Sequence, residues 1–219
     1  MSRNAAPRAR RSRLAAPLAQ SFYLRPTEQV ARDLLGAVLE HRTSEGVTAG
    51  IIVETEAYVG EHDLACHAAA GITQRTAPLY GPPGIAYVYF IYGMYWCVNA
   101  VTRAEGEPSA VLIRAIEPVT GIEVMRARRP RARSPVDLAN GPGKLCLALG
   151  IDRACNWQSL ERSALVIRAG AAVPDRRVTV TPRIGISRCA DWPLRWFVND
   201  SPFVSRPPSP LARRAAGRK

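Results

Sequence analysis

The order of apolar runs along the chain constrains its fold more than any other feature of the sequence. Strand-like runs are predicted at Val47–Thr55, Ile85–Phe90, Cys97–Thr102, Ala110–Glu117, Leu165–Ala169, Val178–Thr181 and Leu194–Val198. Helical spacing of apolar residues is found at Thr27–Leu39, Gly121–Arg128 and Lys144–Leu149. The strands outnumber the helices and do not alternate with them, which argues against a doubly wound parallel sheet. The order predicts an α+β fold: a single compact domain with a curved, antiparallel-rich β-sheet core and surrounding helices.

The two ends of the chain differ in composition from its middle. Hydrophobic residues make up 47% of the 219 residues, which is enough for one sizeable core. Residues 1–19 are rich in Arg and Ala, and we expect them to form a disordered basic arm. Residues 206–219, with their closely spaced prolines, are expected to form a second disordered basic tail. The folded domain is therefore predicted to span residues 20–205.

The net charge of +12 favours a polyanionic partner, because fixed positive charge releases counterions from phosphate. A basic surface in contact with solvent alone is the alternative. Between residues 126 and 133 the chain holds five arginines. This segment is either a solvated loop or part of a surface that follows a DNA backbone, and the sequence favours neither.

Five cysteines lie far apart along the chain: Cys66, Cys97, Cys146, Cys155 and Cys189. Their odd number and the absence of any C-x-x-C pair predict neither a disulfide framework nor a zinc knuckle. A reducing cytoplasm suits such a chain best. The N-terminus lacks the apolar run of a signal peptide, and no stretch approaches the roughly 20 apolar residues of a membrane span.

Two acidic residues stand close together in the segment Val53–Tyr58. Strand alternation places Glu54, Glu56 and Tyr58 on one face of the predicted strand. Two acids in so short a strand are unusual, because strands are depleted in them. In one interpretation, one of them is a catalytic carboxylate at the end of a strand. In the other, both lie on an exposed face of the sheet and form salt bridges.

Aromatic residues are concentrated in the segment Tyr87–Trp96, where six of ten residues are aromatic against 7% for the chain. A buried aromatic strand accounts for some of them. Gly93 indicates a turn, which would place Tyr92 at the tip of a hairpin. In a basic protein, an aromatic tip can stack on nucleic-acid bases or wedge between them.

Several of these motifs together resemble the alkyladenine (3-methyladenine) DNA glycosylase family, the mammalian-type purine DNA glycosylases also found in bacteria. The resemblance covers about residues 20–205. It is carried, in order, by Glu56-Ala57-Tyr58, His67, the segment Tyr87–Tyr95, Asn99, Arg114–Pro118 and Asn140–Cys146.

The resemblance implies a role for each matching residue. Glu56 is expected to be the general base that activates water, with Arg114 and the main chain of Ile184 holding that water. Around the flipped base, the expected walls are Tyr58, His67 and Tyr89, with Asn99 on the pocket floor. On the DNA side, we expect Tyr92 to fill the vacated space, and Arg129 and Lys144 to contact the backbone.

The resemblance also implies the reaction. It predicts a monofunctional DNA glycosylase of base excision repair, which flips alkylated, deaminated or etheno purines out of duplex DNA. It would then hydrolyse the N-glycosidic bond and leave an abasic site. A monomer without metal or redox cofactor is expected, and in a bacterium it would be cytoplasmic and associated with the nucleoid. Lysine occurs only at Lys144 and Lys219, which favours water over an amine nucleophile.

Two other classes of function remain open at this stage. One is a DNA-binding module without catalysis. The other is a metal-dependent nucleic-acid hydrolase that would use Glu54, Glu56 and His67. The acids, histidines and cysteine between Glu61 and His67 match no zinc signature in their spacing.

Overall fold

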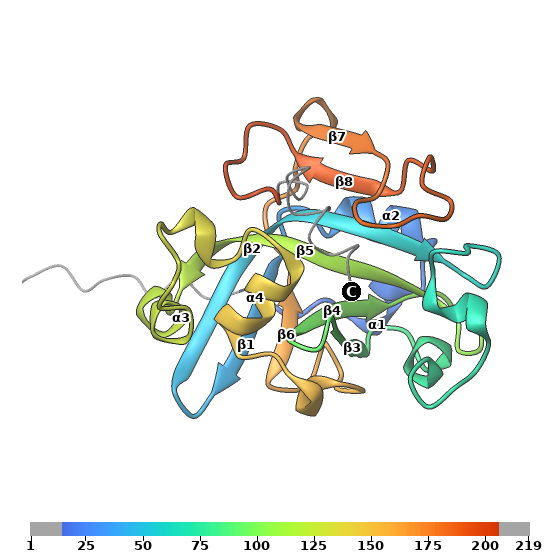
Figure 1. Cartoon of the computed structure of the whole chain (residues 1–219), viewed down its shortest axis with the longest axis horizontal. Helices are drawn as coiled ribbons and strands as arrows, with labels where there is room; N and C mark the ends of the chain where they lie inside the picture. Colours follow the sequence, from blue (N-terminus) through green and yellow to red (C-terminus); the bar gives the residue numbers. More distant parts are fainter. Residues whose placement is uncertain (1–14, 206–219) are drawn as a thin grey trace, which may run out of the picture.

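The computed structural model describes residues 15–205, and an eight-stranded sheet forms their centre (Figure 1). The strands are β1 Val38–Thr43, β2 Gly46–Val59, β3 Ala86–Ile91, β4 Tyr95–Val101, β5 Ser109–Thr120, β6 Leu165–Arg168, β7 Val178–Thr181 and β8 Arg195–Val198. The main path runs β3-β4-β5-β2-β1-β6, with β8 pairing with β2 and β7. All seven strand pairings described are antiparallel, which confirms the predicted fold class.

Strand β2 organises the sheet. It is 14 residues long and pairs with β5 along one edge, while β1 and then β8 share its other edge. Its register with β5 shifts on either side of Glu54, and such bulges bend a long strand. The strand was predicted to end at Thr55 but continues to Val59, because pairing with β5 and β8 extends it. Glu56 and Tyr58 therefore lie within the strand rather than at its end.

The first predicted helix is shorter than its apolar spacing suggested. Helix α2 spans Thr27–Asp33, and Val38 already belongs to β1. Gly36 lies between them with φ 87°, in the left-handed region that favours glycine, and its missing side chain lets Ala171 approach. The prediction of a helix to Leu39 was wrong because apolar residues that fit a helix also pair with β2.

The remaining helices are short. The α-helices are α1 Gln20–Tyr23, α3 Ile122–Arg128 and α4 Pro142–Leu149; 3-10 turns occur at His67–Ala70, Ala77–Tyr80, Val136–Leu138, Arg153–Cys155 and Asp175–Arg177. Helix α2 packs on β2 and β5, and α4 packs on β4 and β5. A large buried cluster joins these helices to the sheet. A smaller one around Leu79, Tyr87 and Val101 lies beneath the aromatic segment.

The chain enters the domain along the outer strand β6. Pro17 bridges Arg168, and the Leu18 amide donates to the Ile167 carbonyl at 2.8 Å. Residues 15–19 of the expected arm thus lie beside the sheet, whereas the rest of the arm and residues 206–219 lie outside the described residues. All five cysteines are free, as the sequence predicted. Between residues 15 and 205, no helix has the length and apolar character needed to cross a membrane.

Candidate active site

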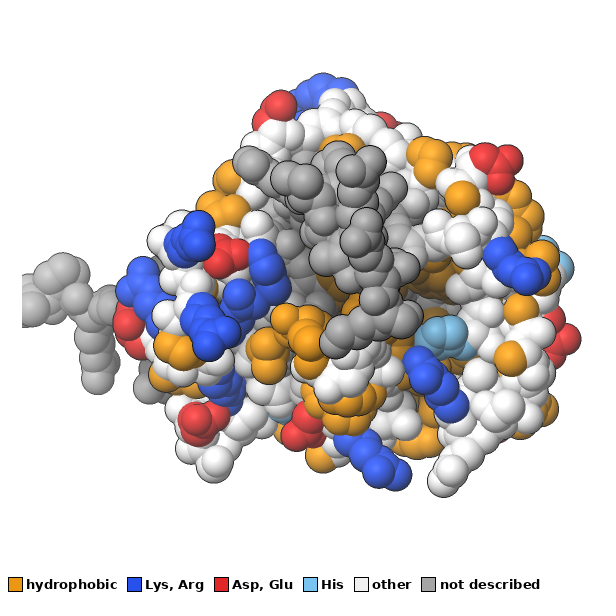
Figure 2. Space-filling view, viewed as in Figure 1, with side chains coloured by type: hydrophobic (Ala, Val, Ile, Leu, Met, Phe, Trp, Pro, Cys, Tyr) orange, Lys and Arg blue, Asp and Glu red, His pale blue; other side chains and the backbone are white. Residues whose placement is uncertain are grey.

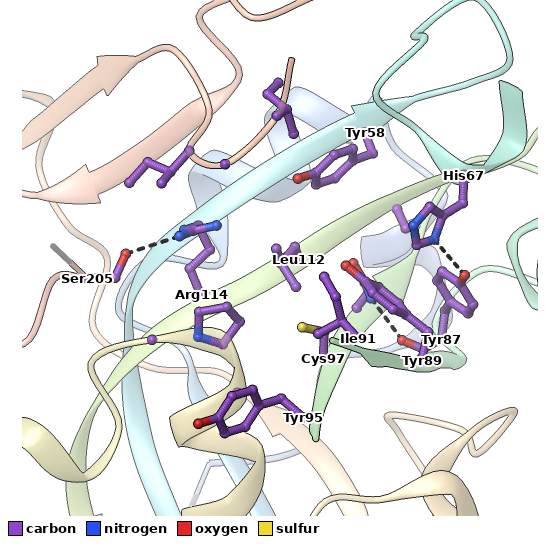
Figure 3. Close-up of a pocket in the computed structure, with 18 of the residues that line it drawn as sticks. Tyr58, His67, Tyr87, Tyr89, Ile91, Tyr95, Cys97, Leu112, Arg114 and Ser205 are labelled. Atoms are coloured by element: carbon purple, nitrogen blue, oxygen red, sulfur yellow. Dashed lines mark hydrogen bonds between the residues drawn. The ribbon is translucent and has the colours of Figure 1, made fainter. Parts of the chain in front are cut away.

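A pocket of about 660 Å³ opens between the end of β2, the β3–β4 hairpin and the start of α4. Its wall includes Tyr58, His67, Tyr89, Asn99 and Arg114, all of which the sequence had assigned to a site (Figure 3). Ile184, Tyr92 and Lys144 also line it. Its volume is in the range of small-molecule binding sites. The fold therefore brings together residues that are up to 147 positions apart, as Tyr58 and Ser205 are.

Glu56 lies just behind the pocket wall and has no exposed surface. Its Oε2 accepts hydrogen bonds from Arg114 Nη1 at 3.1 Å and from the Tyr58 hydroxyl at 2.9 Å. Its Oε1 accepts the Ile184 amide at 2.7 Å. Three donors therefore satisfy the hydrogen-bonding needs of the buried carboxylate. Tyr58, Arg114 and Ile184, which supply these donors, line the pocket themselves.

The hydroxyl that faces Glu56 is a donor. Burial, and then the nearby Glu56 carboxylate, raise the pKa of Tyr58 well above its usual value, so its hydroxyl stays protonated. The guanidinium of Arg183 stands over the Tyr58 ring, 4.7 Å from the ring centroid. Arg183 also pairs with Asp63, and both side chains are fully buried. This ion pair fixes the backbone directly before Ile184, whose amide contacts Glu56.

Glu54 is buried as deeply as Glu56. Its Oε1 accepts from Arg114 Nε at 3.1 Å and from Arg195 Nε at 2.6 Å. The Ser205 amide donates to Oε2 at 2.6 Å, and the Ser205 hydroxyl donates to Oε1 at 2.8 Å. The alternative of an exposed sheet face with salt bridges is thus wrong: both acids belong to a buried ion-pair network. Sequence reasoning missed Arg195 and Ser205, which no local motif marks.

The aromatic wall is built from three rings in contact. His67 Nδ1 lies 2.8 Å from the Tyr87 hydroxyl, and the His67 and Tyr89 ring centroids are 4.6 Å apart at 75°. Burial, and then the nearby Arg75, lower the pKa of His67 to about 4, so the imidazole is neutral at neutral pH. Tyr87 was not assigned to the site, although its alternation with Tyr89 in the aromatic segment was a signal.

Asn99 is buried on β4, directly opposite Tyr87 of β3. Its Nδ2 donates to the Tyr87 carbonyl at 3.0 Å. Strand pairing thus determines both the depth and the orientation of the amide. Asn99 also lines the pocket.

Tyr92 occupies the tip of the β3–β4 hairpin, as Gly93 had indicated. Its side chain is 78% exposed, and Met94 beside it is 60% exposed. Tyr92 and Gly93 have φ values of 55° and 67°, and the Met94 amide donates to the Ile91 carbonyl at 3.2 Å. Two positive φ values match the type I′ turns that suit hairpins, although a tyrosine adopts one at a cost. The turn therefore holds an aromatic ring in solvent at the rim of the pocket.

The start of α4 also lines the pocket. Gly143 packs against Tyr95, where an added Cβ would come within 2.9 Å of the ring. The Lys144 ammonium donates to Asp137 and to Asn140, the latter at 2.7 Å. Lys144 thus lines the pocket, and its ammonium group is held by its two neighbours Asp137 and Asn140. Arg129 does not line the pocket, and burial lowers the pKa of its guanidinium.

The arginines between residues 126 and 133 divide into two groups. Arg126 pairs with Glu123, and Arg128 pairs with Glu45. Arg131 and Arg133 are exposed. Figure 2 shows basic side chains gathered toward α3. Part of this segment therefore stabilises the fold, and part is available to a polyanion.

The cluster of acids and histidines after β2 does not form a metal site in the part of the chain described. No group of three or more His, Cys, Asp and Glu side chains comes close enough there to hold a metal ion. Asp63, the central acid of the cluster, is engaged by Arg183.

Residues 21–202 match the family model described as methylpurine-DNA glycosylase (MPG). Three relatives each carry the name "Putative 3-methyladenine DNA glycosylase". The one from Myxococcus xanthus is 48% identical over 202 residues, which cover 91% of this chain and 98% of the relative. Those from Methanocella arvoryzae and Methanoculleus marisnigri are also 48% identical, over 86% of this chain and 96% and 98% of their own lengths. The chain belongs to the methylpurine-DNA glycosylase family.

Proposed function

We propose that this family member flips damaged purines out of duplex DNA and hydrolyses their bond to deoxyribose. The proposed substrates are alkylated purines, and deaminated and etheno purines are further candidates to be tested beside them. The observation that carries the proposal is Glu56, a fully buried carboxylate held by Tyr58, Arg114 and Ile184 at the wall of an aromatic pocket.

Base flipping explains the pocket and the hairpin together. A base within a duplex is out of reach, and extruding it costs a few kcal/mol. Stacking against Tyr58 and Tyr89 offsets this cost, and an exposed Tyr92 can occupy the gap that the base leaves. The neutral His67 can bond to a purine edge.

Hydrolysis needs only a water molecule and the carboxylate. The water oxygen bonds to C1′ of the sugar while the bond from C1′ to the purine nitrogen breaks, and its electron pair leaves with the base. The water gives its proton to Glu56. Arg114 and the Ile184 amide hold the carboxylate and the water in place. An alkylated purine cation needs little further help, because it leaves as a neutral base.

The surroundings of Lys144 support direct hydrolysis. An amine that attacks the sugar must be free and uncharged. The Lys144 ammonium is engaged by Asp137 and Asn140. Within residues 15–205 it is the only lysine. This supports a monofunctional enzyme that leaves an abasic site.

The DNA partner is a duplex that reaches the rim of the pocket. Tyr92 and Lys144 both line the pocket, and Arg129 lies near Lys144 through their shared neighbour Asp137. We propose that the two cations contact backbone phosphates and that a monomer suffices.

The direct test is to incubate the protein with methylated duplex DNA in the presence of a chelator and to separate the released bases by chromatography. Free 3-methyladenine is the expected result. Binding of the lesion without release would instead indicate a module without catalysis. Release that the chelator abolishes would indicate a metal-dependent hydrolase.

A further inference from the structure

The last described residue of the chain lies among the catalytic groups. Ser205 lines the pocket and is 5% exposed, and Figure 3 shows its side chain next to Arg114. It stands beyond residues 21–202, the part matched by the family model. Neither the local sequence nor the resemblance assigned it a role.

Both the backbone amide and the hydroxyl of Ser205 form hydrogen bonds with the ion-pair network. Its amide donates to Glu54 Oε2 at 2.6 Å, and its hydroxyl donates to Glu54 Oε1 at 2.8 Å. Its Oγ accepts a hydrogen bond from Arg114 Nη2 at 3.3 Å. Because the hydroxyl proton points to Glu54, the oxygen lone pairs are left for Arg114.

The orientation of Arg114 depends on these contacts. Its Nε donates to Glu54, its Nη1 to Glu56 and its Nη2 to Ser205. The two carboxylates compete for one guanidinium. Ser205 supplies Glu54 with two donors of its own and gives Nη2 a partner, so that Nη1 stays directed at Glu56.

We propose that Ser205 is a positioning residue of the active site, which holds Arg114 in the orientation that serves Glu56. The inference rests on the proposed role of Glu56 as the base. It makes the segment that follows β8 a part of the catalytic site rather than the end of the fold.

Substitution of the hydroxyl tests the proposal. Ser205→Ala leaves Arg114 Nη2 without its partner and removes one donor from Glu54. We expect single-turnover release of methylated purines to fall about tenfold, the scale of one hydrogen bond to a charged group. Affinity for lesion-containing duplex should stay unchanged. Ser205→Thr keeps the hydroxyl and should recover most of the rate.

Ser201→Ala is the matched control, since it removes a hydroxyl from the same segment. Among the described residues, that hydroxyl accepts a hydrogen bond only from the Phe203 amide. This variant should retain the wild-type rate. A thermal melt of each variant is run beside the kinetics. If Ser205→Ala does not fold, Ser205→Cys decides, because a thiol has nearly the same shape but is a weak donor.

A folded Ser205→Ala or Ser205→Cys protein with the wild-type single-turnover rate overturns the proposal. So does a loss that threonine does not recover, or one that appears equally in lesion binding. Glu56→Gln, measured in parallel, separates failure of the role of Ser205 from failure of the proposed mechanism. If Glu56→Gln is inactive and Ser205→Ala is not impaired, only the role of Ser205 fails. If Glu56→Gln keeps its rate, the proposed mechanism fails with it.

Discussion

Glu54 and Glu56 share a strand and a buried ion-pair network, yet we expect their amide variants to fail in different ways. Glu56 faces the pocket wall through Tyr58, Arg114 and Ile184, whereas the partners of Glu54 come from β5, β8 and the C-terminal segment. We expect Glu56 to act in the reaction and Glu54 to stabilise the network that positions it.

Glu56→Gln keeps the size of the side chain and removes its charge and basicity. Single-turnover excision should fall by about two orders of magnitude or more, the usual scale for loss of a general base. Lesion binding should survive, because Tyr89, Tyr92 and the cations are untouched. Glu123→Gln, at an exposed site on α3, controls for the loss of one acid. A folded Glu56→Gln protein that excises 3-methyladenine at the wild-type rate would rule out the mechanism.

Glu54→Gln is expected to act first on stability. Removing this charge leaves the buried Arg195 without its carboxylate partner and Arg114 with Glu56 alone, so the network carries one uncompensated positive charge. Breaking a buried ion pair from one side typically costs about 3–5 kcal/mol. Denaturant unfolding should show a loss on this scale, larger than that of Glu56→Gln. A stability equal to the wild type would mean that the network does not hold the fold together.

His67 gives the protein a dependence of stability on pH. Its pKa falls from 6.5 to about 4 on burial, so between these values the unfolded chain binds a proton that the folded protein does not. The contribution of His67 to the free energy of unfolding is therefore fully present above pH 6.5 and is lost as the pH falls toward 4. In His67→Gln, unfolding free energies measured across this window should decline less steeply. An equal slope in both proteins would contradict the assignment.

At the scale of secondary-structure elements, the β3–β4 hairpin delivers Tyr92 and also supplies the pocket residues Tyr89 and Asn99. Its turn is short and holds the ring 78% exposed. Because one hairpin carries both Tyr92 and part of the pocket, the proposed mechanism links insertion of Tyr92 into the duplex to entry of the base.

Tyr92→Ala should therefore impair flipping more than hydrolysis. The lost ring can no longer fill the gap in the duplex, whereas Glu56 and its partners are unchanged. Excision of a lesion in a complete duplex should suffer more than excision opposite an abasic site, where extrusion costs less. Equal losses on the two substrates would count against a wedge. Met94→Ala, at the adjacent exposed position, tests whether the effect belongs to the tyrosine.

At the scale of the whole molecule, two basic ends start from different places. The first described residues lie along β6, the outer strand of the sheet, and the last described residue lines the pocket. Residues 1–14 and residues 206–219 each contain five cations and no acid. The two ends thus carry the same number of basic side chains, but the described residues next to them lie at different places on the domain.

Deletion of residues 1–14 and deletion of residues 206–219 form a matched pair. Each should weaken DNA binding and reduce its salt dependence, because each removes phosphate contacts. The C-terminal deletion should have the larger effect, since residues 206–219 directly follow Ser205, which lines the pocket. Single-turnover chemistry on saturated enzyme should be spared in both. If DNA binding by a deletion variant depends on salt concentration as strongly as binding by the full chain, the deleted end does not contact DNA.

The sequence by itself determined the kind of sheet and the kinds of residues in the site. Apolar runs that do not alternate with helices predicted an antiparallel sheet, and Tyr92-Gly93 predicted the hairpin tip. These are local properties, because turn chemistry and strand patterning act over a few residues. The motif matches that marked Glu56, Arg114 and the aromatic residues were likewise local in the chain.

Only the tertiary structure decided which donors meet the two buried acids. Arg195 and Ser205 reach Glu54 from 141 and 151 residues away. A carboxylate without exposed surface needs donors, but its own sequence neighbourhood cannot say which of many arginines will supply them. The end of α2 was decided in the same way, because pairing of Val38 with Ile51 outweighed local helical spacing. Long-range pairing thus placed both acids of an ambiguous strand in a buried ion-pair network.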